Sequence, residues 1–114
     1  MTDCLFCRII RKEIPSRIVF ENERVLAFRD VNPQAPVHVL IVPKLHIAGL
    51  NDILTDNNAL LGEIQNIARE IALKENVAKS GWRLVCNCGP DAGQAVAHLH
   101  YHLLGGRAMH WPPG

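Results

Sequence analysis

The chain has 114 residues, a length that suits one domain with one hydrophobic core. Hydrophobic residues make up 48%, charged residues make up 20%, and the net charge is +1, so the composition predicts a globular protein without the basic surface of a nucleic-acid binder. Two uncharged runs, residues 31–43 and 92–106, are too short and too polar to span a bilayer. The N-terminus lacks the pattern of a signal peptide. We therefore expect a single domain over residues 1–114, located in the cytoplasm, with no nucleic-acid or membrane partner.

The first half of the chain predicts a short helix followed by three strands. The helix runs from Cys4 to about Lys12, with Asp3 as its cap, and ends before the Ile14-Pro15 pair because a residue that precedes proline disfavours the helical region. Strands over residues 17–21 and 24–28 form a hairpin, and a loop with two prolines over 31–36 leads to a β-branched strand over 37–42.

The second half predicts one long helix and two further strands. Residues 45–54 show no clear periodicity. The long helix covers about 58–76, with Asp56 or Asn57 as its cap, and its apolar stripe consists of Leu60, Leu61, Ile64, Ile67, Ala68, Ile71 and Ala72. A strand over 82–87, a glycine-rich turn over 88–94, an alternating strand over 98–104 and an extended tail over 107–114 follow. Mostly hairpin-connected strands predict an antiparallel α+β domain, and its open sheet edges favour a dimer.

Histidines alternate with large apolar residues in the last predicted strand, at positions 98, 100 and 102. On a strand these three imidazoles share one face, with about 6–7 Å between neighbours. A lone histidine on a strand is commonly structural, whereas three on one face favour chemistry near neutral pH. A neutral imidazole can attack phosphorus or an acyl carbon when its other nitrogen has a partner that fixes the tautomer. His38, in another strand, is a candidate for orienting one of the three.

The glycine-rich turn before this strand offers backbone N–H groups that can form an anion-binding nest. Asn87 and Gln94 add neutral donors, so a phosphate is the group we expect to be attacked. The turn lacks the Gly-Lys-Ser/Thr ending of a P-loop, and by itself it is equally typical of a plain connection.

Four apolar residues, Phe6, Ile9, Ile14 and Phe28, are candidates for a pocket beside Asp30. An acidic residue at the edge of such a pocket often accepts hydrogen bonds from ribose hydroxyls. The alternative interpretation is that all four belong to the ordinary core.

The Cys4-x-x-Cys7 pair has the spacing of half a zinc site. The alternatives are a redox pair, a four-sulfur site completed by Cys86 and Cys88, a mixed site completed by two histidines such as His46 and His98, and two small buried side chains. The redox interpretation lacks the βαβ context it usually has, and spacing alone does not choose between the two zinc sites. Outside secretory compartments, cysteines are expected to be thiols or metal ligands.

The run His98-x-His100-x-His102, followed by hydrophobic residues and Gly-Gly-Arg, resembles the signature of the histidine triad (HIT) family. Further matches to the Hint branch of that family extend over nearly the whole chain: residues 9–15 (IIRKEIP), Asp30 with 33–36 (PQAP), 42–47 (VPKLHI), Gly93-Gln94 and 110–114 (HWPPG). The resemblance implies a HIT-like α+β fold with a five-stranded antiparallel sheet, one long and one short helix, and a homodimer with a continuous sheet.

The resemblance also implies an activity: hydrolysis of purine nucleoside 5′-phosphoramidates, typically of adenosine or guanosine, through a nucleotidyl-histidine intermediate. His100 matches the nucleophile, His102 the partner that contacts phosphate and assists the leaving group, and His38 the supporting histidine. The implied nucleotide contacts are Phe6, Ile9, Ile14 and Phe28 for the base, Asp30 and Val31 for the ribose, and Asn87, Gly93, Gln94 and Ala95 around the phosphate. The implied structural zinc site is the mixed one, with Cys4, Cys7, His46 and His98 as ligands.

Ala95 departs from the pattern, because relatives usually place a serine or threonine that contacts phosphate there. We therefore expect a slower enzyme than relatives that have the hydroxyl. The alternatives are a dinucleoside-polyphosphate hydrolase of the related Fhit branch, a nucleotide-binding protein with vestigial catalysis, and a small zinc module that binds protein. The Trp111-Pro112-Pro113 ending favours the phosphoramidase over the Fhit-like activity.

Overall fold

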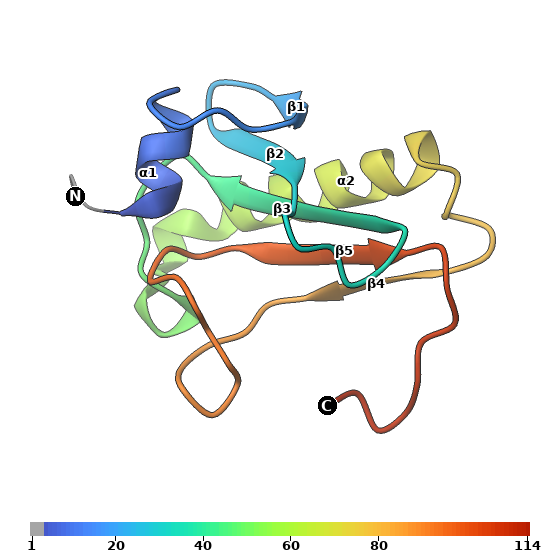
Figure 1. Ribbon diagram of the computed structural model, residues 1–114. Helices are drawn as coiled ribbons and strands as arrows, with labels where there is room; N and C mark the ends of the chain where they lie inside the picture. Colours follow the sequence, from blue (N-terminus) through green and yellow to red (C-terminus); the bar gives the residue numbers. More distant parts are fainter. Residues whose placement is uncertain (1–3) are drawn as a thin grey trace.

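The computed structural model describes residues 4–114, in which five strands form one antiparallel sheet in the order β1-β2-β3-β5-β4. The elements are α1 (Leu5–Ile10), β1 (Ile18–Glu21), β2 (Val25–Arg29), β3 (Val37–Pro43), the short 3₁₀ helices η1 (Leu50–Asp52) and η2 (Thr55–Asn57), α2 (Asn58–Lys74), β4 (Trp82–Val85) and β5 (Tyr101–Gly105) (Figure 1). The predicted α+β class, with a five-stranded antiparallel sheet, one long helix and one short helix, is confirmed.

Helix α2 covers one face of the sheet (Figure 1). Its buried residues are Ile64, Ile67, Ala68, Ile71 and Ala72, all within the predicted stripe. They pack against side chains that alternate along the strands, including Val25 and Ala27 of β2, Val39 and Ile41 of β3, and Leu103 of β5. Asn57 is the N-cap residue as predicted, but its side chain accepts the backbone N–H of Leu54 and makes no cap bond to α2. No helix in the described part of the chain is long and apolar enough to cross a membrane.

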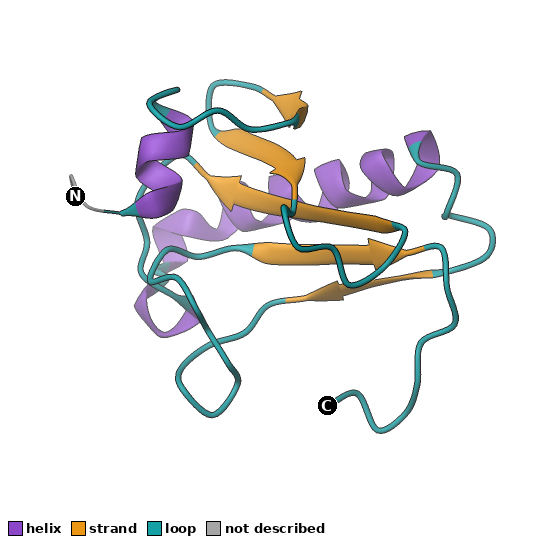
Figure 2. Cartoon of the chain, in the orientation of Figure 1, coloured by secondary structure: helices purple, strands orange, loops and turns teal. Residues whose placement is uncertain are grey.

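The opposite face of the sheet is covered in part by the short helix α1 (Figure 2). Phe6 and Ile9 of α1 pack with a second set of strand residues, which are Leu26 and Phe28 of β2 and Leu40 and Val42 of β3. Alternate side chains of β3 therefore enter two different cores. This explains why its sequence is apolar at every position except His38.

The predicted histidine strand begins later than expected, because His98, Leu99 and His100 precede β5. The ladder cannot extend further because Pro43, at the end of β3, has no N–H to donate. The segment before β5 bonds instead to the chain beyond β3: Leu99 N–H donates to the Ile47 carbonyl. The strand predicted over 82–87 also ends early, at Val85, which leaves Asn87 outside the sheet.

The predicted helix cap, Asp3, lies outside the described residues. The N-cap of α1 is Cys4, whose Sγ accepts the backbone N–H of Cys7 at 3.4 Å. Because the N-cap and the third helical residue of a helix lie close together, a Cys-x-x-Cys pair placed there brings its two sulfur atoms to the same helix end.

Candidate functional site

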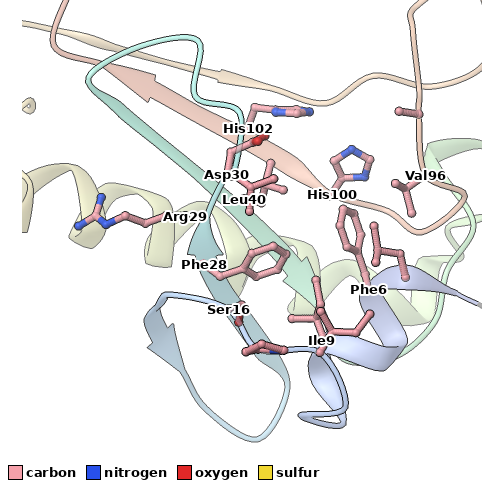
Figure 3. A pocket seen from close by; sticks show the side chains of 15 residues that line it. Phe6, Ile9, Ser16, Phe28, Arg29, Asp30, Leu40, Val96, His100 and His102 are labelled. Atoms are coloured by element: carbon pink, nitrogen blue, oxygen red, sulfur yellow. The ribbon is translucent and has the colours of Figure 1, made fainter.

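A cavity of about 380 Å³ opens on the α1 side of the sheet, a size typical of small-molecule sites. It is lined by Leu5, Phe6, Ile9, Ile14, Pro15, Ser16, Phe28, Arg29, Asp30, Val31, Leu40, Ala95, Val96, His100 and His102. Figure 3 shows His100, His102 and Asp30 toward one end and Ile9, Ser16 and Phe28 toward the other. The cavity therefore joins an imidazole-lined end to an apolar end.

The apolar end contains all four residues that the sequence predicted for a base pocket. The Phe6 ring meets Phe28 edge-on, with 5.7 Å between ring centroids, and meets His100 at 5.0 Å. Phe6, Ile9 and Phe28 are also buried in the second core, so these residues both line the cavity and belong to the core. Val31 stands at the rim with a relative exposure of 99%.

His100 is buried, and a single hydrogen bond fixes its tautomer. Its Nδ1 lies 2.7 Å from the carbonyl oxygen of His98, which can only accept. Nδ1 therefore holds the proton in the neutral ring, and Nε2 has the free lone pair. An imidazole in this state can act as a nucleophile toward an electrophile in the cavity.

The proton positions on His38 and His102 follow from a second set of hydrogen bonds. The backbone N–H of Gln34 donates to His38 Nδ1 at 3.0 Å, so the proton of neutral His38 is on Nε2. His38 Nε2 lies 2.9 Å from His102 Nδ1 and donates to it, which leaves the His102 proton on Nε2. The sheet register brings the rings together, because Leu40 pairs with His102 and His38 is two residues away on the same face of β3.

Both of these histidines are neutral at pH 7. Burial lowers the pKa of His38, although Asp30, whose Oδ2 is 3.4 Å from His38 Nε2, opposes this effect. Burial, with repulsion from His100 and His38, lowers the pKa of His102 to about 4. The site therefore combines a nitrogen lone pair on His100 with an N–H donor on His102, and the two ring centroids are 5.1 Å apart.

A second cluster lies beside the cavity and brings together the side chains of Cys4, Cys7, His46 and His98. Cys4 Sγ and Cys7 Sγ lie 3.3 and 3.6 Å from His98 Nδ1. His46 Nδ1 lies 3.3 Å from Cys7 Sγ and 3.1 Å from His98 Nδ1. A tetrahedral metal with ordinary Zn–N and Zn–S lengths would hold such ligand atoms about 3.3–3.8 Å apart.

The protonation of the cluster also fits a bound cation. His98 Nε2 donates to the Pro43 carbonyl at 2.8 Å, so the lone pair on Nδ1 faces the two sulfur atoms. Burial raises the pKa of the Cys7 thiol, a penalty that a bound cation would offset. The four cysteines are free thiols, as predicted, and the mixed set converges without Cys86 or Cys88, which overturns the four-sulfur alternative.

Asp30, His38 and His102 form another group whose ligand atoms lie close together, but its hydrogen bonds do not favour a metal. His38 Nδ1 already accepts the Gln34 N–H, so a metal on Nε2 would require an imidazolate or the loss of that bond. The hydrogen bonds of this group therefore place protons, and no metal, between the two rings.

The predicted phosphate contacts are divided by the structure. Ala95 lines the cavity, whereas Asn87, Gly93 and Gln94 do not. The Gln94 side chain instead braces its own loop: Oε1 accepts from the Gly89 N–H, and Nε2 donates to the carbonyls of Ala48 and Val96.

Sequence reasoning missed several lining residues, namely Leu5, Pro15, Ser16, Arg29, Leu40 and Val96. Leu40 could have been found, because it lies two residues from His38 and therefore shares its face of the strand. Val96 is in an irregular segment and gives no such signal.

Comparisons with known proteins agree with this geometry. A family model described as HIT domain matches residues 11–109. The 14 kDa zinc-binding protein of Zea mays is 49% identical over 112 residues, covering 96% of this chain and 87% of the relative. Adenylylsulfatase HINT1 of Arabidopsis thaliana is 47% identical over 112 residues, covering 96% of this chain and 76% of the relative.

Among solved structures, a HIT family hydrolase from Legionella pneumophila Philadelphia 1 superimposes with a TM-score of 0.97 at 52% identity, covering 98% of this chain and 100% of that one. The match spans the sheet, both helices and the histidine segment. The chain belongs to the HIT domain family.

Proposed function

We propose that this protein is a hydrolase that cleaves the P–N bond of purine nucleoside 5′-phosphoramidates, releasing the nucleoside monophosphate and an amine. The observation that carries the proposal is the 2.7 Å bond from His100 Nδ1 to the His98 carbonyl, which leaves a nucleophilic lone pair on Nε2. Similarity to a HIT family hydrolase and to an adenylylsulfatase supports hydrolytic chemistry at a nucleotide phosphorus.

The proposed reaction has two displacements at phosphorus. His100 Nε2 forms a bond to phosphorus while the P–N bond to the amine breaks, the departing nitrogen takes a proton from solvent, and His102 Nε2–H stabilises the displacement by donating a hydrogen bond. Water then attacks the nucleotidyl-His100, gives up a proton to solvent, and releases the nucleoside monophosphate with His100 restored. His38 fixes the orientation of His102 through the 2.9 Å bond.

The base would lie against Phe6, Ile9 and Phe28 at the apolar end of the cavity, and Asp30 would accept from the ribose hydroxyls beside Val31. Asn87 and Gly93 remain proposed phosphate contacts on the family resemblance alone. Because the apolar end offers few polar side chains, we expect adenine and guanine nucleotides to bind.

We further propose that the Cys4, Cys7, His46 and His98 cluster binds a structural zinc ion. The name of the maize relative supports zinc. Four protein ligands fill a tetrahedral shell, so the ion would hold α1 to the segment that bears His98 and would leave no position for a reacting water.

The test is release of AMP from an adenosine 5′-phosphoramidate by the wild type, His100→Ala and, as a matched control, His110→Ala, whose side chain does not line the cavity. We expect turnover by the wild type and the control and near-complete loss in His100→Ala. Mass spectrometry of rapidly quenched wild type should also find one nucleotidyl group on His100.

An inactive wild type that still binds AMP would favour the binding-protein alternative. Cleavage of dinucleoside polyphosphates in preference to the phosphoramidate would favour the Fhit-like activity. The absence of nucleotide binding would leave the zinc module.

A further inference from the structure

The chain that leaves β5 returns to the loop that orients His38. Residues Val37 and Gly105 are partners in the β3–β5 ladder, so antiparallel pairing carries the next residues of each strand alongside one another. Residues 106–107 therefore run beside residues 34–36. This brings the Gly-Gly-Arg motif, which neither the cavity nor the metal cluster uses, next to the loop over residues 33–36.

Two contacts hold these segments together. A Cβ added to Gly106 would come within 2.9 Å of the Pro36 side chain, and the φ of Gly106 is +91°, so this position favours glycine on two grounds. The Arg107 Nε donates to the Gln34 carbonyl at 2.9 Å, and its Nη1 donates to the carbonyl of Ala108 at 3.0 Å. The guanidinium therefore links the Gln34 carbonyl to the C-terminal tail through hydrogen bonds.

Gln34 is also the residue that sets the tautomer of His38. Its N–H donates to His38 Nδ1 at 3.0 Å, and His38 Nε2 donates to His102 Nδ1 at 2.9 Å. If Gln34 moved away, His38 could hold its proton on Nδ1 and present a lone pair to His102. The His102 proton would then shift to Nδ1, and Nε2 could no longer donate into the cavity.

The geometry points to Arg107 as a positioning residue, which acts through Gln34 and His38 to keep the His102 proton on Nε2. The path runs from the tail, through three successive hydrogen bonds, to a cavity-lining histidine. Arg107 does not line the cavity itself, so its effect is on proton placement and not on ligand contact. The catalytic consequence rests on the proposed function, whereas the tautomer consequence does not.

The test uses Arg107→Ala, Arg107→Lys and the matched control Arg83→Ala. Arg83 also donates to a tail carbonyl, that of His110 at 3.1 Å, and borders the same surface pocket as Arg107, but no hydrogen bond connects it to Gln34. The readouts are ¹⁵N chemical shifts of the imidazole nitrogens of His38 and His102, AMP affinity, and kcat for an adenosine 5′-phosphoramidate.

In the wild type we expect the Nε2–H tautomer for both rings. Arg107→Ala should give mixed tautomers at both histidines and lower kcat about 3- to 10-fold, the effect of one lost hydrogen bond, with AMP affinity unchanged. Arg107→Lys, which retains one donor, should recover part of both effects, and Arg83→Ala should match the wild type.

The inference is overturned if the tautomers of His38 and His102 in Arg107→Ala equal those of the wild type. It is also overturned if Arg83→Ala shifts them equally, because the effect would then be a general loosening of the tail. If the wild type were inactive, only the proposed function would be rejected, because the ¹⁵N chemical shifts would still report the tautomers of His38 and His102.

Discussion

His38, His98, His100 and His102 differ in what binds their ring nitrogens, and these partners set where each proton lies. His98 donates from Nε2 to the Pro43 carbonyl, so the lone pair on its Nδ1 faces the sulfur atoms of Cys4 and Cys7. His100 donates from Nδ1 and keeps its lone pair on Nε2. His38 accepts at Nδ1, and this places a proton on Nε2 of His38 and then of His102. Backbone groups therefore fix the tautomers of His38, His98 and His100, and the His38 ring fixes that of His102.

Ala95 lines the cavity with His100 and His102, so a hydroxyl there would add a donor near the proposed phosphate site. A fully effective oxyanion-hole donor contributes about 2.7–4 kcal/mol to transition-state stabilisation. Because Ala95 is exposed to solvent, a hydroxyl at this position should contribute less than that. We expect Ala95→Ser to raise kcat at least about 10-fold with little change in stability. Steady-state turnover measures this. Ala97→Ser, outside the cavity, is the control, and unchanged turnover in Ala95→Ser would refute the role given to the missing hydroxyl.

The low pKa of His102 makes folding stability depend on pH. Its pKa is about 4 in the folded state and about 6.5 in an unfolded chain, so the unfolded state binds more protons between these values. The free energy of unfolding should therefore fall as the pH is lowered, by about 1–2 kcal/mol from pH 7 to 5 for His102 alone. Urea denaturation at both pH values, compared with His102→Gln, isolates this contribution. Equal decreases in the two proteins would contradict it.

At the scale of elements, α1 is a helix of six residues, far below the length at which an isolated helix is stable in water. Phe6 and Ile9 hold it in place by packing in the second core, and Cys4 and Cys7 join it to His46 and His98 in the cluster of potential metal ligands. Phe6 and Ile9 also line the cavity, so whatever fixes α1 also shapes the apolar end of the candidate site.

If the proposed zinc ion is bound at this cluster, its removal should lower both the free energy of unfolding and the affinity for nucleotide. A metal ion whose free concentration is 100 to 1,000 times its Kd stabilises the folded state by about 3–4 kcal/mol. Removing the ion with EDTA, or removing a ligand with Cys7→Ser, should therefore lower Tm clearly and raise KM for the phosphoramidate. Calorimetry, metal analysis and steady-state kinetics measure these effects. Cys88→Ser, outside the cluster, should behave like the wild type, and a Tm insensitive to EDTA would argue against a bound structural ion.

At the scale of the whole molecule, α2 covers one face of the sheet, α1 covers part of the other, and the candidate site lies on the α1 side. Long-range ion pairs tie α2 to the sheet: Arg29 binds Glu75 at 2.8 and 3.0 Å, and Arg24 binds Glu63 at 2.7 and 2.8 Å. Such partly exposed pairs contribute little to stability, so the two cores carry most of it. The sheet ends in two edge strands, β1 and β4.

The expected homodimer can be assigned to one of these edges. The β1–β2 ladder has a register shift between Ile18 and Phe20, a feature that discourages edge pairing, whereas the β4–β5 ladder is regular. We therefore expect pairing through β4. Sedimentation should show a dimer for the wild type and for Ile18→Lys on β1, and dissociation for Val85→Lys on β4. A monomeric wild type, or dissociation by the β1 variant alone, would contradict this assignment.

Residue periodicity and local chemistry predicted much of the secondary structure from the sequence. The α2 stripe, the β1–β2 hairpin and the β-branched β3 were predicted because their residues repeat with the period of their element. The limits of β4 and β5 were not, because they depend on where a neighbouring strand stops offering hydrogen-bonding groups. Val96 was missed as a cavity-lining residue because it lies in an irregular segment, which has no periodicity that indicates which side chains face the cavity.

By itself, the sequence determined that alternating histidines would share a face, that the Cys4-x-x-Cys7 pair has the spacing of half a zinc site, and that the chain resembles one family. Spacing alone did not choose between His46 with His98 and Cys86 with Cys88 as partners of those cysteines, and the family resemblance implied the histidines. The tertiary structure brings His46 and His98 to them. It alone also assigned a proton to one nitrogen of each ring. The physical reason is that a histidine has two equivalent possibilities in sequence, and only a partner brought from a distant part of the chain makes one of them lower in energy.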